Sequence, residues 1–211
     1  MKITDVERKE VKKVLKGFNS EKRKTKEEIF YDLCFCICAP QTTFISNNKV
    51  QKALREADFY REDIPLEKLH EMVKPARFFR MKSQRLIEAK ELFNTWLYGY
   101  VKERLDLLSR KHPSLFETEL RDALEYNVKG LGMKAASHLC RNLGCTEVAI
   151  IDTHVLKFMG LNLSDISSRT KYAEVEEKFK AIAKECGMSS VELDAWIWKK
   201  YSNTSWDDFI Y

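Results

Sequence analysis

A lysine and an aspartate are the two side chains of this sequence best suited to covalent chemistry. Lys134 follows the run Gly-Leu-Gly-Met at 130–133, and Asp152 ends the apolar run at 149–151. An uncharged lysine amine is a nucleophile, and a nearby carboxylate stabilises positive charge that develops during a reaction. Whether the two act together depends on the elements that carry them.

Two glycines one residue apart predict a tight turn directly before Lys134. Gly130 and Gly132, two of only seven glycines in the chain, lie between helical patterns at 115–126 and 134–143. No strand precedes them, which excludes a Rossmann phosphate loop. A helix–hairpin–helix instead exposes backbone N–H groups that favour an anion such as a backbone phosphate. The same helix dipole disfavours a charge on Lys134, which makes it either a plausible nucleophile or simply a surface lysine.

The second member of the pair can return to the first. The helix over 134–143 travels roughly 15 Å, and residues 144–151 reach back at most about 26–29 Å when extended. Asp152 can therefore lie beside Lys134. Its plainer interpretation is an N-cap of the helix that Thr153 opens.

The hairpin motif resembles a known superfamily. The run Gly-Leu-Gly-Met-Lys, with Ile-Ile-Asp-Thr-His 18 residues after the lysine, is similar to the helix–hairpin–helix DNA glycosylases. The runs Val-Lys-Gly-Leu-Gly-Met-Lys-Ala-Ala-Ser-His and Arg-Asn-Leu-Gly most resemble the archaeal-type, second branch of 8-oxoguanine DNA glycosylase/AP lyases. The likeness extends through Cys-Phe-Cys-Ile at 34–37, Arg-Phe-Phe-Arg at 77–80 and Glu-Leu-Asp-Ala-Trp-Ile-Trp at 192–198.

The resemblance implies an all-α fold of two helical lobes, with the hairpin at the cleft between them. It also implies a bifunctional enzyme that excises 8-oxoguanine from double-stranded DNA. Lys134 would form a Schiff base with the sugar and nick the strand by β-elimination, and Asp152 would stabilise positive charge on the sugar. Two alternatives stay open, an endonuclease III-like glycosylase for oxidised pyrimidines and a non-catalytic DNA-binding module.

Further site residues follow from the resemblance. Gln41 would fill the space that the extruded base leaves, and Phe78 and Trp198 would line the base pocket, although aromatic residues of this kind are more often core. Asp194 would contact the base edge or order the pocket. Lys129, with Gly130 and Gly132, would contact phosphate. His138, one turn after Lys134, suits either the site or ordinary helix packing.

Composition limits the class of protein. The 211 residues are 44% hydrophobic and 33% charged with a net charge of +5, typical of a soluble globular protein and compatible with a polyanion partner. Neither a signal peptide nor a membrane-spanning run is apparent, so we expect a cytoplasmic protein, acting as a monomer. The closely spaced Cys34, Cys36 and Cys38 suggest buried thiols. Without a CxxC pair, and with Cys186 alone near the C-terminus, we expect neither a metal nor another cofactor.

The elements expected to position the site form one unit over 1–211. Residues 40–140 would make a central lobe with the hairpin at 127–134, and residues 1–39 plus 141–211 a terminal-segment lobe. Helices are expected at 83–98 and 100–110, on either side of Gly99. Capping boxes are predicted for Ser114 with Glu117 and for Ser189 with Glu192. The stretch 74–85 is rich in Arg, Lys and Phe without an acidic residue, which suits a nucleic-acid surface. The role of the aromatic tail at 205–211 is open.

Overall fold

The computed structural model describes residues 3–16, 24–108 and 113–202, and within these ranges the chain forms helices and loops without a β-strand. In chain order the elements are α1 (Asp5–Lys16), α2 (Lys26–Cys38), α3 (Phe44–Glu56), α4 (Leu66–Val73), α5 (Phe79–Leu92), the π-helix η1 (Phe93–Leu97), α6 (Tyr98–Leu108), α7 (Pro113–Asn127), α8 (Met133–Asn142), α9 (Thr153–Met159), the 3-10 helix η2 (Leu163–Ile166), α10 (Arg169–Glu185) and α11 (Ser190–Ser202). The all-α fold class is confirmed. The aromatic tail at 205–211 lies outside the described residues.

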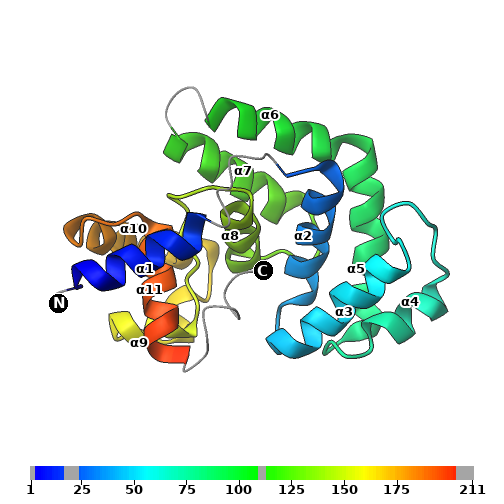
Figure 1. Ribbon diagram of the computed structural model, residues 1–211, viewed down its shortest axis with the longest axis horizontal. Helices are drawn as coiled ribbons and strands as arrows, with labels where there is room; N and C mark the ends of the chain where they lie inside the picture. Colours follow the sequence, from blue (N-terminus) through cyan, green and yellow to red (C-terminus); the bar gives the residue numbers. More distant parts are fainter. Residues whose placement is uncertain (1–2, 17–23, 109–112, 203–211) are drawn as a thin grey trace.

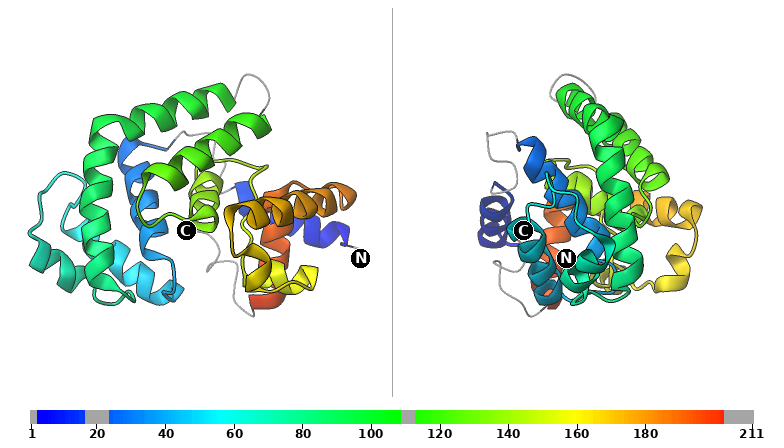
Figure 2. Two further views of the ribbon diagram at one scale, coloured as in Figure 1. Left: turned by 180° about the vertical axis from the view of Figure 1, so that it is seen from behind. Right: turned by 90° about the vertical axis from the view of Figure 1, so that its right-hand side faces the viewer.

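Two hydrophobic cores divide these helices into two lobes. The larger core draws on α2 to α8 and extends to Val148, and the smaller one draws on α1, the segment from Ala149, α9, α10 and α11. Figures 1 and 2 show the two groups on opposite sides of α8. Helix α8 contributes Ala136 and Leu139 to the larger core and Met133 to the smaller one. The helix that begins at the hairpin is therefore the one the lobes share.

The expected boundary at residue 39 differs from this packing. Every residue of α2 from Ile29 to Cys38 is buried, and all of them except Asp32 belong to the larger core. A helix that is apolar on all sides must be surrounded by other elements, and α3, α5 and α8 surround it. Residues 26–39 therefore belong with the central lobe. Cys34, Cys36 and Cys38 are free and buried, as predicted.

Of three local predictions, the helix break at Gly99 and one capping box are wrong, and the other capping box is confirmed. Gly99 does not break the helix, since α5, η1 and α6 run on without interruption. A glycine costs a helix only about 1 kcal/mol, and the buried Phe93, Leu97 and Val101 offset that cost. The capping box of Ser189 and Glu192 is confirmed. The box expected for Glu117 is wrong, because its carboxylate instead accepts backbone hydrogen bonds from residues 146–148.

Candidate active site

The hairpin presents unpaired backbone donors toward solvent. α7 ends at Asn127 and α8 begins at Met133. Gly132 is the N-cap of α8, and no side chain makes a capping hydrogen bond there. Gly130 has a φ of 101°, a left-handed conformation that favours glycine, and a Cβ there would lie 2.8 Å from Cδ of Arg85. Gly132 has a φ of −87°, and a Cβ there would meet nothing within 4 Å. The fold therefore requires glycine at 130 but leaves open space at 132, beside the positive end of α8.

A cleft of ≈ 1010 Å³ opens in front of this hairpin. Of the site residues expected from the sequence, Gln41, Gly130, Gly132, Lys134, Asp152, Asp194 and Trp198 line it, whereas Phe78 and Lys129 do not. Lys134 comes from the first turn of α8 and Asp152 from the residue before α9. The lysine and the aspartate thus share one cavity, as the chain lengths between them allow.

Asp152 is an N-cap, and it retains acceptor capacity. Its Oδ1 accepts hydrogen bonds from the backbone N–H groups of His154 (2.8 Å) and Val155 (2.9 Å). Both of these bonds use one carboxylate oxygen, so Oδ2 is not engaged by the helix start. The two interpretations of Asp152 in the sequence are therefore geometrically compatible, since one oxygen caps α9 while the carboxylate lines the cleft.

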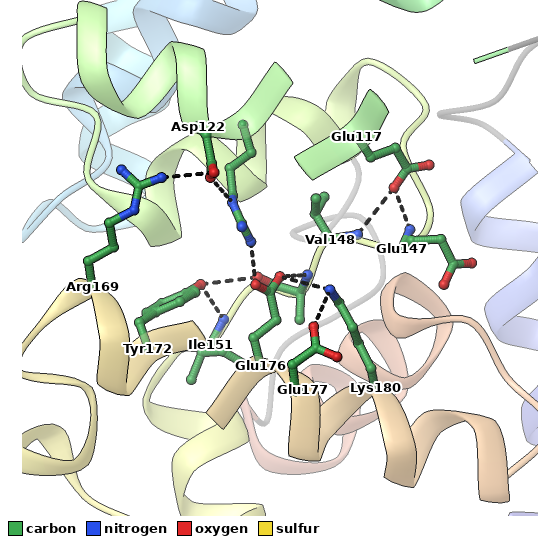
Figure 3. Close-up of polar contacts among 12 residues, drawn as sticks. Glu117, Asp122, Glu147, Val148, Ile151, Arg169, Tyr172, Glu176, Glu177 and Lys180 are labelled. Carbon is green, nitrogen blue, oxygen red and sulfur yellow. Dashed lines mark hydrogen bonds and ion pairs between the residues drawn. The ribbon is translucent and has the colours of Figure 1, made fainter. Parts of the chain in front are cut away.

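Glu117 on α7 fixes the chain that leads to Asp152. Its two carboxylate oxygens accept from the backbone N–H groups of residues 146, 147 and 148 at 2.9, 2.6 and 3.2 Å. Figure 3 shows this carboxylate directed at Glu147 and Val148. Burial raises the pKa of Glu117, and the three N–H donors oppose the rise. Sequence reasoning missed this role because the partners lie about 30 positions away.

A cluster of buried and half-buried polar side chains lies behind Lys134, on the same face of α8. His138 and Arg141 follow it at the i+4 and i+7 positions, and all three line the cleft. Nη2 of Arg141 lies 2.7 Å from Nε2 of His138, and Nη1 lies 3.8 Å from Oδ2 of Asp194 on α11. The helical spacing was the signal that could have identified Arg141.

Burial and neighbouring charges set the protonation of this cluster. Desolvation, with a contribution from the charge of Asp152, raises the pKa of Asp194 to about 7, against the opposing effects of Arg141 and Lys134. Desolvation also lowers the pKa of His138 well below its ordinary value, and Arg141 and Lys134 lower it further. The neutral imidazole is therefore the stable form of His138 in the folded protein.

A buried lysine holds the loop that carries Gln41. Nζ of Lys82 donates to the carbonyl oxygens of Cys38 and Pro40 and to Oγ1 of Thr42, each at 2.7 Å. Gln41 is exposed and has a φ of 54°. Lys82 was expected on the basic surface at 74–85, and the structure corrects this, because its side chain is buried and desolvation lowers its pKa. It orders the loop rather than facing solvent.

Phe78 and Lys129, the two expected site residues that do not line the cleft, lie on the protein surface outside it. Phe78 precedes α5 with a φ of 59° and is 48% exposed, with the Arg77 guanidinium 4.8 Å from its ring centre. The neighbouring Phe79 packs against the larger core. Lys129 is exposed and pairs with Glu88 at 3.1 Å. Phe78 was expected in the base pocket, but it does not line the cleft.

The described ranges contain neither a candidate membrane span nor a candidate metal site. No helix there is long and apolar enough to cross a membrane. Nor do three or more His, Cys, Asp or Glu side chains in these ranges gather into a group that could hold a metal ion.

Comparison with known proteins gives one consistent result. Residues 11–188 match the family model Ogg-HhH, described as 8-oxoguanine DNA glycosylase. The chain is 31% identical to an 8-oxoguanine DNA glycosylase/AP lyase of Methanocaldococcus jannaschii, over 93% of each chain. It is also 31% identical to a Saccharolobus solfataricus protein of the same name, over 84% of each chain.

Solved structures agree with the sequence matches. The crystal structure of the M. jannaschii 8-oxoguanine DNA glycosylase has a TM-score of 0.76, at 31% identity, and the match covers 95% of this chain and 90% of that one. A structure of the M. jannaschii 8-oxoguanine glycosylase/lyase in complex with a 15mer DNA containing 8-oxoguanine has a TM-score of 0.75, at 29% identity and 95% and 93% coverage. Fold and hairpin cleft thus define a helix–hairpin–helix DNA glycosylase. Within that class, the chain belongs to the 8-oxoguanine DNA glycosylase family.

Proposed function

We propose that this protein is a bifunctional DNA repair glycosylase that excises 8-oxoguanine from double-stranded DNA and then nicks the strand. The observation that carries the proposal is the shared cleft of Lys134 and Asp152, next to a hairpin with unpaired N–H donors. One chain supplies all of these groups, so we take the active protein to be a monomer. It acts on chromosomal DNA in the cytoplasm.

Binding begins with the sugar–phosphate backbone. The N–H groups at the start of α8 donate hydrogen bonds to phosphate oxygens, and the cation of Lys129 attracts a phosphate. The open space at Gly132 lets the strand approach. An enzyme that acts on a duplex base must extrude it, at a cost of a few kcal/mol. Gln41, on the loop held by Lys82, fills the vacated space. The extruded base enters the cleft against Trp198, with Asp194 ordering the pocket.

The chemistry follows from the amine and the carboxylate. As the N-glycosidic bond breaks, positive charge develops on the sugar, and the carboxylate of Asp152 stabilises it. The neutral amine of Lys134 forms a bond to C1′ as the base leaves with the bonding electron pair. One amine proton is then transferred to O4′ as the C1′–O4′ bond breaks, which opens the sugar ring and leaves a protonated Schiff base between Nζ and C1′. Loss of the C2′ proton to water leaves its electron pair in a C1′–C2′ enamine. The enamine electrons then form the C2′–C3′ double bond as the C3′–O bond breaks, which expels the 3′ phosphate and nicks the strand.

Covalent trapping tests the nucleophile. Borohydride reduces a Schiff base to a stable amine, so wild-type protein incubated with 8-oxoguanine duplex should form a protein–DNA adduct. We expect Lys134→Gln to lose both the adduct and nicking while retaining DNA binding. The matched control, Lys129→Gln, removes a nearby exposed cation and should bind more weakly but still form the adduct. An undiminished adduct in Lys134→Gln would show that another residue is the nucleophile.

Two further measurements separate this proposal from its alternatives. A non-catalytic binding module would show no adduct with any damaged duplex. An enzyme for oxidised pyrimidines would prefer thymine glycol when duplexes with different lesions compete, and that preference would overturn the choice of 8-oxoguanine. Asp152→Asn should bind DNA normally and excise the base slowly. If its binding falls as much as its rate, Asp152 is a structural cap only.

A further inference from the structure

The segment that delivers Asp152 to the cleft belongs to no helix or strand. Residues 146–151 form a bend and loop between α8 and α9, and Ala149 and Ile151 are fully buried. Buried backbone N–H and C=O groups need hydrogen-bonding partners, which a helix or sheet would otherwise supply. Here side chains from neighbouring helices supply them, as Figure 3 shows. Glu117 forms hydrogen bonds with the beginning of the segment, and side chains of α10 form hydrogen bonds with its end.

One face of α10 contacts the last residues before Asp152. The hydroxyl of Tyr172 accepts from the N–H of Ile151 and donates to the carbonyl of Ala149, both at 3.0 Å. One turn later, Glu176 accepts from the N–H of Ala149 at 2.9 Å. The same carboxylate forms a buried ion pair with Arg121 of α7, which fixes α10 against the larger lobe.

The Tyr172 hydroxyl is suited to both of its bonds. The side chain is buried, which raises the pKa of its phenol and keeps it protonated as a donor. Its two bonds reach the residues on either side of Ile150, so they fix the backbone of the tripeptide that ends next to Asp152. On the other side, the cap bonds of Oδ1 fix Asp152 to α9. Tyr172 also lines the cleft.

We propose that Tyr172 is a positioning residue for Asp152, because its hydroxyl clamps the backbone immediately before the aspartate and so sets the distance of the carboxylate from the reacting sugar. This inference rests on the proposed function. Small displacements of a catalytic group lower rates steeply, by up to about a hundred-fold for 1 Å. Hydrogen bonds to the residue directly before Asp152 therefore have a large effect on the rate of glycosidic cleavage.

The test uses Tyr172→Phe, which removes only the hydroxyl. We expect single-turnover excision of 8-oxoguanine to slow by about ten-fold or more, with the affinity for the lesion duplex unchanged. Borohydride trapping on a preformed abasic site should keep its wild-type yield, because no glycosidic bond remains to be broken there. All rates are measured well below the melting midpoint of each variant. A loss of trapping equal to the loss of excision would indicate general damage and overturn the proposal.

Tyr31→Phe is the matched control. Tyr31 is also buried, and its hydroxyl also bridges two backbone groups, accepting from Tyr60 and donating to Leu54 at 3.4 Å each, but it lies in the larger core. Its removal should leave the excision rate unchanged. If Tyr31→Phe slows excision as much as Tyr172→Phe does, the position beside Asp152 is irrelevant and the proposal is wrong.

A double-mutant cycle separates this inference from the proposed function. If Tyr172 acts through Asp152, then adding Tyr172→Phe to Asp152→Asn should slow excision by less than about two-fold further. The same loss in both backgrounds would refute the positioning role and leave the proposed chemistry intact. Wild-type excision by Asp152→Asn alone would instead refute the role of Asp152, and the positioning role with it.

Discussion

Nη2 of Arg141 lies 2.7 Å from Nε2 of His138, and this single contact fixes the state of the imidazole. A guanidinium carries only N–H donors, so Nε2 must accept, and the proton of a neutral ring then resides on Nδ1. Burial lowers the pKa of His138 in the same direction. The residue one turn after Lys134 on this face is therefore uncharged, and the next cation on the face is Arg141, at the i+7 position.

The first prediction concerns His138. The unfolded chain binds a proton at this residue below about pH 6.5, and the folded chain does not, so stability contributed by the neutral ring is lost as pH falls below 6.5. We expect His138→Gln, whose side-chain oxygen can still accept from Arg141, to lose less stability between pH 6.5 and 5 than the wild type. Urea unfolding at several pH values measures this. Equal losses in both proteins would mean that His138 is protonated in the folded state.

Asp194 should have the opposite pH dependence. Its pKa is raised from 3.8 to about 7 by burial and the charge of Asp152. Between these values the folded protein holds a proton that the unfolded chain has released, so stability falls as pH rises through this window. We expect Asp194→Asn to flatten that fall, whatever its absolute stability. A slope unchanged from wild type between pH 4 and 7 would show that Asp194 ionises normally, paired with Arg141.

The two hairpin glycines should respond differently to substitution. Gly130→Ala forces a side chain into a left-handed conformation and against Arg85, which we expect to lower the melting temperature by several degrees. Gly132→Ser places a favoured N-cap in open space, so thermal stability should hold or rise. Its affinity for duplex DNA should fall about ten-fold, because the hydroxyl occupies the N–H groups that a phosphate needs. Unchanged affinity would place the DNA elsewhere.

Lys82 should matter for stability despite being a lysine in a basic segment. Lys82→Met keeps the buried stem but leaves the carbonyl of Cys38 without its lysine donor, at about 1–3 kcal/mol for an unsatisfied group, and leaves the carbonyl of Pro40 with only the Thr42 hydroxyl at 3.4 Å. We expect the melting temperature to fall by roughly 5–10 °C and lesion affinity to fall with it. The control is Lys74→Met, an exposed lysine paired with Glu71, which should shift melting by less than about 2 °C.

Sequence reasoning succeeded where the determinants are local. The spacing of Gly130 and Gly132 predicted the hairpin, and Asp152 before Thr153 predicted a helix start, because caps and turns depend on a few adjacent residues. It failed for Glu117 and Lys82, whose partners lie about 30 to 44 positions away. Nothing near either residue distinguishes a buried polar group from a solvated one, and charge favours the solvated interpretation.

The lobe boundary failed for a related reason. The apolar run in α2 correctly predicted that this helix is buried. Which lobe buries it depends on the arrangement of α3, α5 and α8, which the run does not reveal. The cluster of His138, Arg141 and Asp194 likewise needs α11 to bring Asp194 near Arg141 of α8, and the packing of the smaller core, not any motif, places α11.

The position of α8 in both cores determines which partner must deform during recognition. Any rotation of one lobe against the other would pull Met133 from its packing or Ala136 and Leu139 from theirs. Close-packed interiors resist such sliding. We therefore expect recognition to deform the DNA more than the protein. Such a division would favour duplexes that are already weakened at the damaged base pair.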